Sequence, residues 1–142
     1  MSLNVLVVDD SSVMRTMIIR TLRLCGLALG EIHQAANGQE GLQVLEGNRI
    51  DLALVDINMP IMNGAEMLNL MRQNPQTAAL PVIIVSTEGS EARIEFFRGQ
   101  GAEFVHKPFT PEALRETIVG FTGVTDGEQP GEGAVQSGGL DF

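Results

Sequence analysis

Cysteine, lysine and long hydrophobic runs are scarce in this chain. Its only cysteine, Cys25, cannot form an internal disulfide, and packing at the end of a helix suits this thiol better than reactivity. No apolar stretch approaches the roughly 20 residues that a membrane-spanning helix needs. The first four residues lack the charged segment of a secretory leader. These absences predict a cytoplasmic protein with no membrane segment.

Basic residues are missing from the last part of the chain. Residues 123–142 contain four acidic side chains, no basic ones, six glycines and a proline, which predicts a disordered tail or a linker. The whole chain of 142 residues has a net charge of −9, which opposes direct binding to nucleic acid. Its hydrophobic content of 44% is enough for a core, so residues 1–122 are predicted to form a single folded domain.

Short apolar runs alternate five times with segments of helical periodicity. A run such as Val5–Val8 is apolar throughout, which is typical of a strand buried on both faces. Repeated alternation predicts an α/β, doubly wound fold, in which helices cover both faces of a parallel sheet. The predicted strands are 5–8, 31–36, 52–55, 81–85 and 104–106, and the predicted helices are 13–25, 37–46, 65–73, 90–98 and 110–121.

Polar residues follow four of these strands: Asp9 with Asp10, then Asp56, Ser86 and Lys107. In a parallel sheet, ligands bind beyond the carboxyl ends of the strands, near the point where the strand order reverses. Lys107 is the only lysine, and its compact ammonium group suits a phosphoryl oxygen. The pattern therefore predicts one small, acidic, phosphate-accepting site.

The adjacent carboxylates of Asp9 and Asp10 predict a metal site. Hard oxygen ligands without nearby thiolates favour Mg²⁺, or Mn²⁺, over zinc, and the backbone carbonyl near Asn58 could add another oxygen. Asp56 could attack phosphorus to give an acyl phosphate once cations neutralise the phosphoryl oxygens. The alternatives are helix capping by Asp10 or Ser11 and a turn role for Asp56.

The two remaining positions are less specific when each is taken alone. Ser86 could place its hydroxyl beside a phosphoryl oxygen, but serines at strand ends are often turn residues, and Thr87 is a competing candidate. Lys107 could simply be solvated. The four polar positions all occur at strand ends. This shared placement favours a common phosphate-accepting site over four separate roles.

Four segments of the chain form a recognisable set. They are Val-Val-Asp-Asp-Ser-Ser-Val-Met-Arg at 7–15, Asp-Ile-Asn-Met-Pro-Ile-Met-Asn-Gly at 56–64, Val85-Ser86, and Lys-Pro-Phe at 107–109. Together they resemble the receiver domains of two-component response regulators, most of all the stand-alone chemotaxis (CheY-like) type. The resemblance covers about residues 3–122 and implies a flavodoxin-like sheet of order 2-1-3-4-5 with five helices.

This resemblance implies that Asp56 accepts a phosphoryl group from a histidine kinase in a Mg²⁺-dependent reaction. Asp10, Asp56 and the backbone carbonyl of Asn58 would bind the metal, with Asp9 acting directly or through water. Lys107 would pair with the phosphoryl group.

The resemblance also implies a switch. Ser86, 30 residues after Asp56, takes the position of the switch hydroxyl, which phosphorylation would draw inward to shift a two-state equilibrium. Phe104 takes the aromatic switch position, where the family often has tyrosine. Asn58 and Glu88 match the chemotaxis pattern at positions that tune dephosphorylation, which suggests a short-lived phosphoryl group.

One departure from the family concerns length. Gly101-Ala102 stands one residue closer to Lys107 than is usual, so the shape of the surface around the fourth helix, fifth strand and fifth helix is in doubt. This surface usually meets partners. A flagellar motor switch or another signalling protein is the implied downstream target.

Three other functions are compatible with parts of the pattern. A receiver module of a longer regulator, with residues 123–142 as a linker, is an alternative. A haloacid-dehalogenase-type phosphatase would need a second aspartate where Asn58 stands, and no Gly-x-Gly-x-x-Gly supports dinucleotide binding. We therefore expect no enzyme activity beyond the protein's own phosphorylation and dephosphorylation. Leu140 and Phe142 could dock into a groove on a partner or on the receiver itself.

Overall fold

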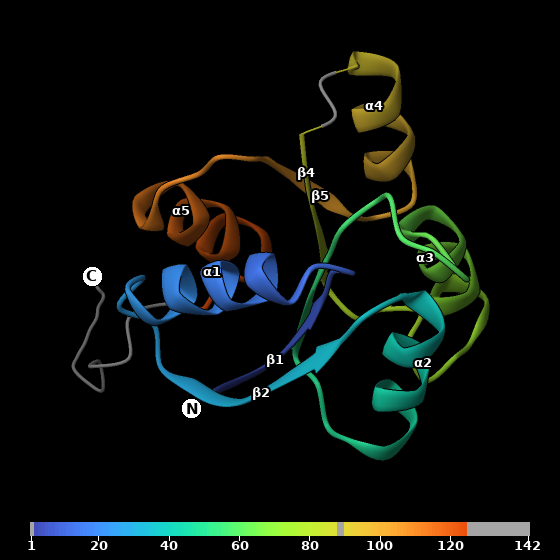
Figure 1. The fold of residues 1–142 in the computed structure, drawn as a ribbon, viewed down its shortest axis with the longest axis horizontal. Coiled ribbons are helices and arrows are strands. Elements are labelled where there is room, and N and C mark those ends of the chain that lie inside the picture. Colours follow the sequence, from blue (N-terminus) through green and yellow to red (C-terminus); the bar gives the residue numbers. More distant parts are fainter. Residues whose placement is uncertain (1, 88–89, 125–142) are drawn as a thin grey trace.

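The computed structural model describes residues 2–87 and 90–124, so Glu88 and most of the predicted tail lie outside the described residues. Strands and helices alternate along this part of the chain (Figure 1). Every predicted element is confirmed, and its ends lie within two residues of the predicted ones. The strands are β1 (Leu3–Val8), β2 (Leu29–Ala35), β3 (Leu52–Val55), β4 (Val82–Ser86) and β5 (Glu103–His106), and the helices are α1 (Ser12–Arg23), α2 (Gly38–Gly47), α3 (Gly64–Gln73), α4 (Glu91–Gly99) and α5 (Pro111–Thr122).

The strands form one parallel sheet in the order β2-β1-β3-β4-β5, as predicted. Every residue of β3 and β4 is buried, which explains why these runs are apolar throughout rather than alternating. The chain passes from β1 outward to β2 and then back across β1 to β3, so the strand order reverses between β1 and β3. The carboxyl ends of these two strands therefore flank the crevice expected in such sheets.

Helices cover both faces of the sheet. Helices α1 and α5 lie side by side over one face, and α2, α3 and α4 lie over the other (Figure 1). The core is divided accordingly: Ile18 and Leu22 of α1 pack with Ile118 of α5 on one side, whereas Met67 of α3 packs with Phe97 of α4 on the other. The two hydrophobic layers hold the sheet, and with it the strand ends, in place.

Polar caps start each helix soon after a strand. The side chains of Ser11, Asn37, Asn63, Ser90 and Thr110 each accept a hydrogen bond from a backbone N–H in the first turn. Asn63 and Glu66 form a complete capping box. These caps fix short loops at the carboxyl edge of the sheet.

The loop after β3 folds back tightly onto the strand end. The N–H of Gly64 donates to the carbonyl of Ile57 at 2.8 Å. A Cβ at position 64 would lie 2.2 Å from the carbonyl oxygen of Asp56, so only glycine fits there. Within this loop, Ile61 has a φ of 68°, an unusual conformation for a β-branched residue. The loop therefore closes around Asp56 at some conformational cost.

Arg72 anchors the connection between α4 and β5, the region in which the sequence predicts a shortened loop. Its guanidinium donates to the carbonyls of Gln100 at 2.8 Å and Leu80 at 2.9 Å, with longer bonds to the carbonyls of Gly101, Ala78 and Thr77. Burial lowers the pKa of this guanidinium. One side chain thus ties α3 to the loops that precede β4 and β5.

Candidate functional site

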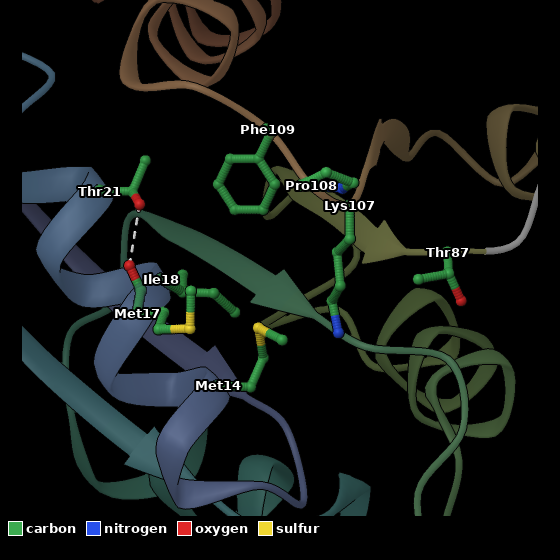
Figure 2. A pocket seen from close by; sticks show the side chains of 8 residues that line it. All are labelled: Met14, Met17, Ile18, Thr21, Thr87, Lys107, Pro108 and Phe109. Carbon is green, nitrogen blue, oxygen red and sulfur yellow. Dashed lines mark hydrogen bonds between the residues drawn. The ribbon is translucent and has the colours of Figure 1, made fainter.

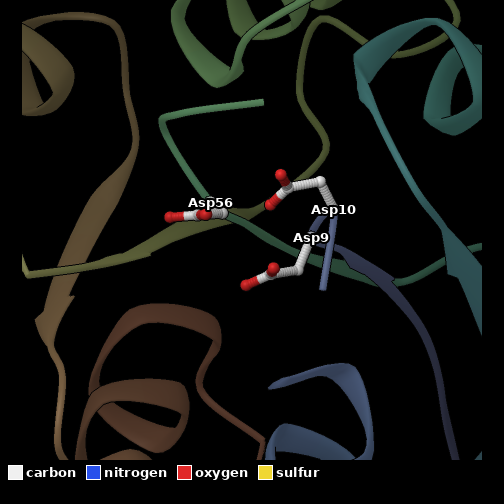
Figure 3. A group of neighbouring side chains, drawn as sticks. All are labelled: Asp9, Asp10 and Asp56. Carbon is white, nitrogen blue, oxygen red and sulfur yellow. The ribbon is translucent and has the colours of Figure 1, made fainter. Parts of the chain in front are cut away.

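Three carboxylates meet at the carboxyl ends of β1 and β3. Asp9 and Asp10 follow β1, Asp56 follows β3, and one carboxylate oxygen of each lies within 4.8 Å of those of the other two (Figure 3). Asp9 is almost fully buried, with 1% of its surface exposed, whereas Asp10 is exposed. The acidic cluster predicted from the sequence is therefore present.

Lys107 completes the cluster from the end of β5. Its Nζ lies 3.2 Å from Oδ2 of Asp9 and 3.6 Å from Oδ1 of Asp56, and its side chain is only 13% exposed. Lys107 pairs with two of the three carboxylates and supplies one positive charge, so the cluster carries excess negative charge when all three are ionised. Such a buried excess favours the approach of a cation.

The pKa of Asp56 is raised above its ordinary value, chiefly because burial disfavours the charged form. The ammonium of Lys107 lowers this pKa, the neighbouring Asp9 raises it, and the N–H of Ile57, which donates to Oδ1 at 2.9 Å, lowers it again. Burial outweighs the two stabilising contacts. A bound divalent cation would supply the missing compensation.

The capping alternative for Asp10 is wrong. Ser11 is the N-cap of α1 and accepts the N–H of Met14 at 3.1 Å. Asp9 fixes the turn by accepting the N–H of Ser11 at 2.9 Å. The carboxylate of Asp10 therefore does not cap α1 and belongs to the acidic cluster.

The donor set fits Mg²⁺. All three side chains offer hard carboxylate oxygens, and an octahedron with Mg–O bonds of about 2.1 Å spans roughly 4.2 Å between opposite ligands. Neighbouring ligands of such an octahedron lie roughly 3 Å apart. The three carboxylate oxygens lie within 4.8 Å of one another, which is close enough for one ion to be held between them. Asn58 is exposed in the loop after β3, and its carbonyl as a ligand stays a prediction.

Ser86 and Thr87 differ sharply in environment. Ser86 ends β4 and is 1% exposed, and its carbonyl accepts the N–H of Lys107 at 2.9 Å. Thr87 is exposed. The backbone thus links Ser86 directly to Lys107. The switch role of the Ser86 hydroxyl stays a prediction.

The comparisons with known proteins agree with this geometry. The response regulator receiver domain matches residues 5–119, which is most of the chain. This chain belongs to that family. Two curated relatives are a CheY homologue from Campylobacter jejuni, 35% identical over 92% of this chain and 100% of its own length, and CheY1 from Helicobacter pylori, 34% identical over 87% and 100%.

Solved structures also resemble this receiver. Chemotaxis protein CheY4 from Vibrio cholerae superposes with a TM-score of 0.75 at 34% identity, covering 85% of this chain and 99% of its own. The receiver domain of a Pseudomonas aeruginosa sensor histidine kinase, which has magnesium coordinated in its active-site cleft, gives 0.74 at 22% identity, with coverage of 87% and 99%. The latter supports the fold only. The chain is therefore a receiver of the CheY type, with chemotaxis proteins among its relatives, and no helix in its described part is long and apolar enough to cross a membrane.

Phe104 of the receiver lies on β5 and is buried. Its ring centroid is 6.5 Å from that of Phe97 and 5.0 Å from that of His106. Phe104 is 8% exposed, so its ring lies inward in this structure. An outward state stays a prediction.

Sequence reasoning missed a hydrophobic cleft beside Lys107. The cleft has a volume of about 290 Å³ and lies between α1 and the loop from β5 to α5 (Figure 2). Met14, Met17 and Ile18 face Phe109 across it. Their helical spacing is visible in the sequence, but it reads equally well as ordinary core packing.

Proposed function

We propose that this protein is a phosphorylation-dependent switch in chemotaxis or motility signalling. A histidine kinase would transfer a phosphoryl group to Asp56, and the modified receiver would change its affinity for a downstream signalling protein such as a flagellar motor switch. The observation that carries the proposal is the joint approach of Lys107 to Asp9 and Asp56, at the edge where three carboxylates meet.

The proposed reaction transfers the phosphoryl group from nitrogen to oxygen. An oxygen of the Asp56 carboxylate attacks phosphorus, the bond from phosphorus to the kinase imidazole nitrogen breaks, and that nitrogen keeps the electron pair. Lys107 is placed to pair with a phosphoryl oxygen because its ammonium already lies 3.6 Å from Asp56. Hydrolysis of the resulting acyl phosphate would restore the carboxylate.

Asp9, Asp10 and Asp56, with the carbonyl of Asn58, would hold Mg²⁺. The ion supplies charge neutralisation for the phosphoryl oxygens. Asp9 and Asp10 place negative charge where such a cation would sit, and the raised pKa of Asp56 reflects the same need for positive charge.

The switch would use Ser86 and Phe104. A phosphoryl group on Asp56 would attract the Ser86 hydroxyl, and the end of β4 would move with it. Phe104 shares β5 with the residues that lead to Lys107, so repacking of its ring would report the change to the surface formed by α4, β5 and α5. Asn58 and Glu88, which lies outside the described residues, would tune the lifetime.

The same features argue against a separate phosphatase activity. A phosphatase with an aspartyl nucleophile needs a general acid for its leaving group, and the amide of Asn58 cannot donate a proton in that way. The protein would act only on its own acyl phosphate, in the cytoplasm. Residues 123–142 would serve as a tail, or as a linker if the receiver is part of a longer regulator.

A phosphotransfer experiment tests the proposal. A chemotaxis histidine kinase labelled by ATP with a radioactive γ-phosphate is mixed with the receiver and Mg²⁺. Label should pass to the wild-type protein and to Asp51→Asn, a matched aspartate at the other end of β3, but not to Asp56→Asn. Transfer to Asp56→Asn, or none to a folded wild-type protein from any such kinase, would overturn it.

A further inference from the structure

Helix α1 has an unusual surface for an acidic protein. It contains Arg15, Arg20 and Arg23 and no acidic residue, while the chain as a whole has a net charge of −9. Arg15 is held by Gln34, but Arg20 and Arg23 are exposed and form no ion pair with another described residue. The outer side of α1 is thus a basic strip without an internal counterpart in the described part of the chain.

The same helix exposes apolar side chains. Of six large hydrophobic residues that are exposed in the described part, three belong to α1 or its C-cap: Val13 at 69%, Met17 at 55% and Leu24 at 67%. The hydrophobic cleft beside Lys107 opens along this helix (Figure 2). At about 290 Å³ it is at the small end of the range for ligand sites, which suits one or two apolar side chains.

The chain itself has a segment of matching chemistry. Residues 125–142 carry four acidic side chains and no basic one. Their large apolar residues are Val135, Leu140 and Phe142, of which the last two stand close together. An acidic segment that ends in an apolar pair matches a basic strip that leads to an apolar cleft.

This segment starts near the end of the basic strip that contains Arg23. Val124 lies beside Ser2 and Leu3 at the amino end of β1. Because α1 returns antiparallel to β1, the end of α1 with Arg23 is at the same end of the sheet. The helix, with 12 residues, is about 18 Å long. The 16 residues from Val124 to Leu140 can span up to roughly 50 Å, which is ample.

We propose that residues 125–142 dock in cis along α1. Their acidic residues lie against Arg20 and Arg23, and Leu140 and Phe142 fill the cleft formed by Met14, Met17 and Phe109. The docked segment covers exposed apolar surface and also covers the flank of the acidic cluster on which Lys107 lies. This assignment is independent of the phosphoacceptor role of Asp56.

Methionine methyl resonances of the full chain provide the test. Met14 and Met17 line the cleft, whereas Met67 and Met71 are buried on the opposite face of the sheet and report whether the fold is intact. Spectra are recorded for ¹³C-methyl-labelled protein, with Met14→Leu and Met17→Leu variants used for assignment. The decisive variant is Leu140→Ser with Phe142→Ser, and Val135→Ser is its matched control.

Docking predicts that the double variant shifts the Met14 and Met17 signals and leaves those of Met67 and Met71 in place, and that Val135→Ser has little effect. Arg20→Gln with Arg23→Gln should move the same signals part of the way, as should added salt, whereas Arg49→Gln should not. Unchanged Met14 and Met17 signals in the double variant would overturn the proposal. So would signals that depend on protein concentration, because these would indicate docking into a second copy.

Discussion

At the scale of single residues, Asp56, the proposed phosphoacceptor, lies in an environment that disfavours its charged form. Its carboxylate is partly buried beside Asp9, with Lys107 3.6 Å away as the nearest cation. Burial outweighs that cation and raises the pKa of Asp56, so the folded protein holds the ionised carboxylate at a cost. This cost has a measurable effect on stability.

Replacing Asp56 should stabilise the protein at neutral pH. Because the pKa of Asp56 is raised in the folded state, that state binds the proton more tightly, and the free energy of unfolding falls as pH rises above about 4. Without divalent cations, Asp56→Asn should be more stable than wild type at pH 7, and the difference should shrink toward acidic pH. Urea unfolding followed by circular dichroism measures it.

The control is Glu95→Gln, which removes an exposed acidic charge on α4. It should change stability little at either pH. A difference for Asp56→Asn that stays constant with pH, or a loss of stability at pH 7, would contradict this view of the carboxylate.

Ile61 has a strained backbone conformation. Its φ of 68° and the hydrogen bond from the N–H of Met62 to the carbonyl of Pro60, at 2.6 Å, describe a tight γ-turn that β-branched residues rarely adopt. The side chain is 75% exposed, so little packing would be lost on replacement. Ile61→Asn should therefore raise the free energy of unfolding by about 1 kcal/mol.

Leu24→Asn is a suitable comparison because Leu24 is also exposed, at 67%, but has a φ of −87°. It should give no such gain in urea unfolding. Equal effects of the two substitutions would show that loss of exposed apolar surface, rather than backbone strain, determines the result.

At the scale of helices and strands, the alternation of apolar runs with helical periodicity predicts all ten elements, because parallel strands buried on both faces leave an unbroken apolar signature. The site follows from the same pattern, since Asp9, Asp56, Ser86 and Lys107 stand at the carboxyl edge. The start of β2 was less visible because Leu29–Glu31 are partly or fully exposed. Backbone conformation at Ile61 leaves no trace in hydrophobic periodicity.

Arg72 shows a further limit of sequence reasoning. An arginine near the end of a helix reads as a solvated charge, and only the folded chain reveals that its partners are carbonyls of the loop that follows α3 and of the loop between α4 and β5. This residue fixes the loop that leads into β5 and hence the approach to Phe104 and Lys107.

Removing this anchor should loosen the region between α4 and β5. Arg72→Met leaves the carbonyls of Leu80 and Gln100 without their charged donor and should reduce the free energy of unfolding by about 2 kcal/mol. Amide hydrogen exchange should accelerate at Ala102, whose N–H donates to the carbonyl of Phe97 at 3.1 Å. Urea unfolding and exchange mass spectrometry measure the two effects.

Arg98→Met is the control, because Arg98 is 56% exposed and pairs only with Glu103 among the described residues. Its effect should stay below ~1 kcal/mol. If Arg72→Met is no more harmful than Arg98→Met, then Arg72 is not an anchor.

At the scale of the whole molecule, one sheet brings together groups that are far apart in the chain. Asp9 and Lys107 are separated by 98 positions and yet lie within 3.2 Å. The receiver family matches residues 5–119, a range that includes all of these side chains, and relatives at 34–35% identity are chemotaxis proteins. The central claim is that the edge forms a Mg²⁺-dependent phosphoacceptor at Asp56.

Intact mass after incubation with Mg²⁺ and acetyl phosphate tests that claim most directly. Wild-type protein should gain about 80 Da, the mass of one phosphoryl group. The gain should vanish in Asp56→Asn and after chelation of the metal, fall strongly in Asp10→Asn, and persist in Asp51→Asn. A folded wild-type protein that gains no mass, or a gain that survives in Asp56→Asn, would contradict the account.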